Sequence, residues 1–154
     1  MSFGSAANTA TPQPDNSKRI HECNDRIYRR NGDIGNLGNQ IEELTWRKNI
    51  LLQGRADENS KKAAFISRTN DERGRLHRIS RVVNIKKANS YYNTVSDFLN
   101  GVACINAETA YDRIIFVIDE ALRQIEDEIY AKNCRINLLQ DEIDLLRIEL
   151  NNLL

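Results

Sequence analysis

The chain of 154 residues contains little proline and few aromatic residues. Its two prolines, Pro12 and Pro14, both lie near the N-terminus, so the remainder lacks the strongest helix breaker. Aromatic residues make up only 6% of the chain, and no segment shows the alternating Val, Thr and Tyr pattern of a half-buried strand. These absences predict an all-α protein with little material for a thick globular core.

The sequence also lacks the motifs of enzymes and metal sites. Its three cysteines form no C-x-x-C pair, which argues against a disulfide framework and a zinc knuckle. His21 and His77 have no metal-like spacing, and neither G-x-S-x-G nor H-E-x-x-H occurs. The glycine-rich segment 32–38 lacks the Lys and Ser/Thr of a phosphate-binding loop, so it favours close helix approach or a hinge. We therefore predict no enzyme, no cofactor and no small-molecule ligand.

Membrane and export signals are missing as well. The longest apolar run, residues 114–118, is too short to span a bilayer. The N-terminus has neither the basic start nor the apolar core of a signal peptide. We expect a cytoplasmic protein, or one that is secreted by a route that needs no signal peptide.

What the sequence does contain is an almost unbroken heptad repeat over residues 122–153, interrupted only by Lys132. Isoleucine and leucine occupy nearly every a and d position. These residues are Leu122, Ile125, Ile129, Ile136, Leu139, Ile143, Leu146, Leu150 and Leu153. Each such side chain left in water forfeits roughly 1.5 to 3 kcal/mol, so the stripe must be buried against another helix, either within the chain or on another protein.

A second heptad register begins at Ile20 and runs to Leu51, with Arg30 and Lys48 as polar interruptions. Gly54 and the polar residues that follow it suggest a break, and Asn100 with Gly101 suggests a second one. We therefore expect a flexible tail over residues 1–16 and a single elongated helical domain over residues 17–154. Its helices should span about 17–53, 58–100 and 106–153, with Asn106 capping the last helix. The residues expected to point inward in the middle helix are Phe65, Leu76, Ile79, Val83, Ala88, Tyr91, Val95 and Phe98.

Charge is distributed unevenly along the chain. Residues 17–92 hold 17 Lys and Arg against 9 Asp and Glu, a balance of +8, whereas residues 93–154 hold 5 against 12, a balance of −7. A basic first part and an acidic last part attract each other. The pattern favours an antiparallel coiled-coil hairpin, or a three-helix arrangement in which the first helix packs internally or on another chain.

The basic residues also leave a nucleic-acid interpretation open. Residues 61–87 hold nine Lys and Arg, but a DNA-reading basic helix should lead directly into a leucine zipper, and this one leads towards Gly101. A solvated face opposite an acidic helix accounts better for these charges.

The C-terminal part, residues 95–154, resembles the small helical partner proteins encoded with LXG toxins of the Gram-positive type VII secretion system, which are relatives of the WXG100 proteins. The matching residues are Phe98 and Gly101 near a turn, then Ile118, Asp119 and Glu120, then the heptad repeat. Two departures exist: no W-x-G occurs, and the nearest match to the aromatic-x-x-x-acid secretion signal is Phe116 with Glu120. In the heptad register these two residues fall at b and f, outside the stripe, although Phe116 packing on a third helix is an equal alternative.

The resemblance implies a non-enzymatic targeting chaperone that binds the helical N-terminal domain of a secreted toxin. The residues expected to bind this partner are Phe98, Gly101, Phe116, Glu120, Ile129, Ile136, Leu139, Ile143, Leu146 and Leu150. A coiled-coil scaffold that associates with itself is the alternative, and a helical nucleic-acid-binding protein is the third reading.

Overall fold

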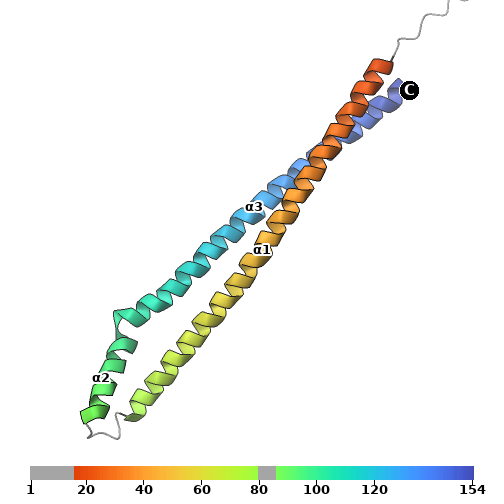
Figure 1. Ribbon diagram of the computed structural model, residues 1–154. Helices are drawn as coiled ribbons and strands as arrows, with labels where there is room; N and C mark the ends of the chain where they lie inside the picture. The colour runs from red at the N-terminus through yellow and green to blue at the C-terminus, as the bar shows by residue number, and fades with distance from the viewer. Residues whose placement is uncertain (1–15, 80–85) are drawn as a thin grey trace, which may run out of the picture. The chain divides into compact units, whose positions relative to one another are not determined.

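The computed structural model describes residues 16–79 and 86–154, which form three helices (Figure 1). Helix α1 spans Ser17–Ile79, α2 spans Lys86–Asn100 and α3 spans Val102–Leu153. No strand occurs within these two ranges. The all-α prediction is confirmed. The predicted tail, except for Asn16, lies outside the described residues.

The predicted break near Gly54 is wrong, because α1 continues through it to Ile79. The heptad register that begins at Ile20 continues in step to Phe65, Leu76 and Ile79. Polar residues occupy several of its later a and d positions, which hid the repeat in the sequence. One glycine in a helix costs roughly 1 kcal/mol relative to alanine, too little to end a helix whose stripe is buried on both sides of it.

The second predicted break is confirmed at Gly101, but the predicted cap at Asn106 is wrong. Helix α3 begins at Val102, so Asn106 lies inside it. At Gly101 the backbone closes tightly: an added Cβ would lie 2.3 Å from the carbonyl oxygen of Asp97. The Gly101 amide donates a hydrogen bond to the Phe98 carbonyl at 3.3 Å. The sharp joint between α2 and α3 therefore requires glycine.

The chain divides into two compact units, each of which takes part of α1 and part of α3. The first unit combines Met1–Asn39 with Lys132–Leu154, and the second is Gln40–Ala131. The grouping of residues 17–154 into one domain stays a prediction.

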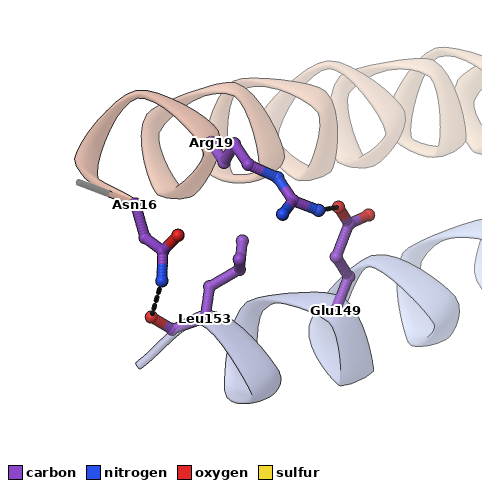
Figure 2. A network of polar contacts seen from close by, with 4 residues as sticks. All are labelled: Asn16, Arg19, Glu149 and Leu153. Atoms are coloured by element: carbon purple, nitrogen blue, oxygen red, sulfur yellow. Dashed lines mark hydrogen bonds and ion pairs between the residues drawn. The ribbon is translucent and has the colours of Figure 1, made fainter. Parts of the chain in front are cut away.

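In the first unit the start of α1 lies beside the end of α3, so the two segments are antiparallel (Figure 2). Asn16 immediately precedes α1, and its amide Nδ2 donates a hydrogen bond to the Leu153 carbonyl at 3.1 Å. This bond satisfies one of the carbonyls that the end of a helix leaves unpaired. One turn further in, Arg19 pairs with Glu149 at 3.0 Å. These two contacts join the N-terminal end of one helix to the C-terminal end of the other.

The second unit is antiparallel as well, and a regular set of ion pairs fixes its register. Three cations at consecutive a positions of α1 each pair with an acid at an e position of α3. The pairs are Lys48–Glu126 at 2.7 Å, Arg55–Asp119 at 2.6 Å, and Lys62–Asp112. Each step of seven residues forward in α1 matches a step of seven residues backward in α3. A one-heptad slip would keep only two of the three pairs, so charged residues at core positions specify the register at some cost in stability.

Helix α2 packs within the second unit against the end of α1. Arg73 donates a hydrogen bond to the Leu99 carbonyl at 2.9 Å, and Leu99 is buried. Tyr91 and Phe98 were predicted to point inward, but both side chains are 48% exposed. Val95, which was also predicted to point inward, is half-buried, and Leu99, which was not, is buried. The predicted Val83 lies outside the described residues, as does the side chain of Ala88. The prediction failed because Leu99, not Phe98, falls on the side of α2 that meets α1.

Candidate partner-binding surface

The heptad stripe of α3 is buried within the chain. Leu139 is 1% exposed and Ile143 is fully buried, both in the first unit, where the only other helix among the described residues is the start of α1. The buried side also extends from Cys104 to Leu153, because every a and d position in that range is buried or half-buried, the charged Glu108 and Lys132 included. An outside helix could reach these side chains only by displacing α1.

The predicted partner-binding set stays a prediction, but the structure shows where its members lie. Six of them face the internal seam. They are Ile129, Ile136, Leu139, Ile143, Leu146 and Leu150, each buried or half-buried. The heptad spacing predicted their burial correctly but could not decide whether the covering helix belongs to the same chain.

The other four predicted residues lie outside this seam. Gly101 forms the joint between α2 and α3, and Phe98 precedes it with a half-exposed ring. Phe116 is 65% exposed, so no third helix among the described residues covers it. Glu120, four residues further along the exposed side of α3, accepts a hydrogen bond from Arg123 at 2.8 Å. This bond and the positive charge of Arg123 hold the pKa of the Glu120 carboxyl below its usual range.

A second apolar stripe, which the sequence analysis missed, runs along the outer side of α3 in the first unit. We call it the outer stripe and define it as Cys134, Leu138, Asp141, Leu145 and Ile148. These residues occupy consecutive f and c positions, with the same alternating spacing of four and three residues as the internal seam. Four of the five are apolar, and the three largest are well exposed: Leu138 by 55%, Leu145 by 68% and Ile148 by 59%.

The outer stripe has the properties expected of a protein-binding surface. Exposed leucines that occur singly are ordinary, but apolar side chains aligned at helical spacing form a continuous patch. Asp141 interrupts the patch with one charge, and no hydrogen bond or ion pair of its carboxylate is found within residues 16–79 and 86–154. A helix covering the stripe could supply both the apolar contact and a cation for Asp141.

Within the described ranges no group of three or more His, Cys, Asp or Glu residues could hold a metal ion. No helix there is long and apolar enough to span a membrane. The glycines of segment 32–38 lie inside α1, and a Cβ at any of Gly32, Gly35 and Gly38 would meet no atom within 4 Å. The expectation of close helix approach at these glycines is therefore wrong.

Comparisons with protein-family models, with curated proteins and with solved structures find no match to this chain.

Two features of the structure have a signal in the sequence that the predictions did not use. Lys48 counted as an interruption of the first repeat, although Lys48, Arg55 and Lys62 are spaced by seven, as are the acids that they contact. The outer stripe has the same seven-residue period as the internal seam, displaced to positions c and f. Reading every heptad position of α3, and not only the strongest stripe, would have found it.

Proposed function

We propose that this protein is a non-enzymatic helical binding partner, which covers an apolar face of another helical protein. The observation that supports this function is the outer stripe of α3. Its three large side chains remain exposed although the chain already buries a complete heptad seam of its own. A second seam on the same helix suits a second helical partner.

The mode of binding would be helix recognition along a groove or face, with apolar anchors at heptad spacing. Leu138, Leu145 and Ile148 would provide the anchors, since large, exposed, aligned apolar side chains contribute most to binding when they become fully desolvated. Asp141 would set the register of the partner, which would need a lysine or arginine opposite it.

The class of partner that we propose is the helical N-terminal domain of an LXG toxin of type VII secretion. The support is the resemblance of the C-terminal part of the chain to the small helical partners of such toxins. In this role the protein would shield the apolar face of the toxin and bring it to the secretion machinery as a targeting chaperone.

Co-expression with the N-terminal domain of an LXG toxin encoded beside this gene tests the proposal. The two chains should co-purify and give the mass of a defined complex by light scattering. Leu145→Asp should abolish the complex, because it replaces the most exposed apolar anchor of the stripe with a second charge. Asn137→Asp is the matched control, since it adds the same charge at an exposed b position of the same helix. A toxin domain that elutes free of the wild-type chain would contradict the proposal.

A further inference from the structure

The two edges of the α1–α3 pair in the second unit are not alike. The three cross-helix ion pairs all use e positions of α3, so one edge of the seam is closed by charge. On the opposite edge, the g and c positions of α3 carry only apolar residues over two heptads. We call this set the lateral face: Ala107, Ala110, Ile114, Val117 and Ala121.

The lateral face is open to solvent. Val117 is 64% exposed and Ile114 is 45% exposed. An open hollow on this side of α3 is lined by Ala110 and Ile114, together with Asn106, Thr109 and Arg113. The face therefore combines two exposed anchors with small residues that allow close approach of a helix.

Basic residues of α1 flank this face. The g positions of α1 fall on the same edge of the seam as the g positions of α3, because antiparallel pairing brings like edges together. Three of them in the second unit are Arg47, Lys61 and Arg68. Among the described residues, Arg47 forms an ion pair with Glu43 and Lys61 forms one with Glu58, both within α1. Arg68 has no ion pair with any residue that the structure describes. A segment that covers the lateral face would gain by carrying acids.

The outer stripe of the first unit has the matching chemistry. Beside its apolar side chains it carries Asp141 within the stripe and Asp144 on its border. The Asp144 carboxylate accepts a hydrogen bond from Gln140 and forms an ion pair with Arg147, both residues of its own helix. The outer stripe is therefore apolar and acidic, whereas the lateral face is apolar and basic.

The two surfaces also match in length and spacing. The first and last members of each are fourteen positions apart along the helix, which is roughly 21 Å. The outer stripe is spaced 4-3-4-3 along the chain, and the lateral face has the same spacing when it is followed in the opposite direction. In an antiparallel arrangement Leu145 would therefore lie opposite Ala110, next to the hollow. Asp141 would lie opposite Ile114, near Lys61.

We propose that, without a toxin, the outer stripe of one copy docks antiparallel on the lateral face of a second copy. Each copy carries one surface of each kind, so a dimer can make this contact once or, as a two-fold pair, once in each direction. Association should then rise with concentration at least to the dimer. The same stripe that is proposed to bind the toxin would be covered by a neighbouring copy, but the experiment below needs only this chain and does not depend on the proposed function.

Complementation between two variants tests the contact. Leu145→Glu places a charge in the outer stripe, and Val117→Glu places one in the lateral face. Both positions are exposed, so circular dichroism should show unchanged helicity. In reducing buffer, light scattering of the wild type should show a mass that rises with concentration from that of a monomer to that of a dimer or more. Each variant alone should remain a monomer, and their equimolar mixture should stop at a dimer, because only one intact surface of each kind remains. Phe116→Glu, at another exposed position of α3, is the control and should associate like the wild type.

A wild type that remains a monomer at its highest soluble concentration would overturn the proposal. So would a mixture of the two variants that contains only monomers. A charge exchange adds a second criterion: Asp141→Lys and Lys61→Asp should each weaken association about tenfold or more, and the double variant that carries both exchanges in one chain should restore it. A double variant that associates no better than the single variants would show that Asp141 and Lys61 do not meet.

Discussion

Replacing the glycines of segment 32–38 with alanine should stabilise the protein. In the structure a Cβ at Gly32, Gly35 or Gly38 would meet nothing within 4 Å, and none of these residues has a positive φ. Each exchange should therefore add only the helix preference of alanine over glycine, about 0.5 to 1 kcal/mol. Since the three positions share no contacts, the triple variant should gain roughly 1.5 to 3 kcal/mol.

Thermal unfolding followed by circular dichroism measures this gain. For a protein of this size 1 kcal/mol corresponds to about 2 to 4 °C, so the triple variant should melt roughly 3 to 12 °C higher. Gly101→Ala should lower the melting temperature in the same assay. Its Cβ would lie 2.3 Å from the Asp97 carbonyl oxygen, so the backbone must shift, at a cost of about 1 to 3 kcal/mol.

A lower melting temperature for the triple variant would refute this reasoning. It would mean that the three glycines bring α1 close to something that the structure does not show. A stabilised variant that no longer bound its partner would instead support the hinge interpretation of this segment.

The remaining predictions concern the seam and its charges. Ile143→Ala should cost about 2 to 5 kcal/mol in chemical denaturation, because Ile143 is fully buried and its removal leaves a cavity; a loss below 0.5 kcal/mol would show that the seam is placed wrongly. Arg55→Asp and Asp119→Arg should each lower the stability of the second unit modestly, and the double exchange should recover most of the loss in a double-mutant cycle. A coupling free energy of zero would show that the two residues do not form a stabilising ion pair. Arg123→Ala should raise the pKa of Glu120 towards its usual range in an NMR titration, because the carboxyl loses the hydrogen bond and charge that lower it. The wild-type pair stabilises the fold above the pKa of an unfolded glutamate and loses this contribution as pH falls through the lowered folded value, so a Glu120 pKa unchanged in the variant would contradict the contact.

Periodicity predicted the fold class and the internal seam, because burial of an apolar stripe follows directly from heptad spacing. It predicted Leu139 and Ile143 as seam residues, and both are buried. It failed near Gly54, where polar a and d residues hid the continuing helix. Those residues are stabilised by cross-helix pairs such as Lys62–Asp112, and such pairs depend on which segments meet.

The candidate site was harder to predict than the fold. The sequence shows that a stripe needs a helical cover, but not whether the cover comes from the same chain. Because α1 covers the a and d positions, the exposed apolar surface consists of residues such as Leu138, Leu145 and Ile148, which lie outside the strongest heptad stripe. Phe116 was correctly placed outside the seam by its b position, and its exposure agrees with that placement.

We propose that partner binding uses the outer stripe and not the buried seam. Calorimetric titration of the proposed partner, the N-terminal domain of an LXG toxin, into the wild type and the Leu145→Asp variant distinguishes the two surfaces, with helicity and melting temperature measured on the same samples. We expect the variant to fold and melt like the wild type but no longer to bind. Wild-type affinity in the variant would show that binding does not use the outer stripe.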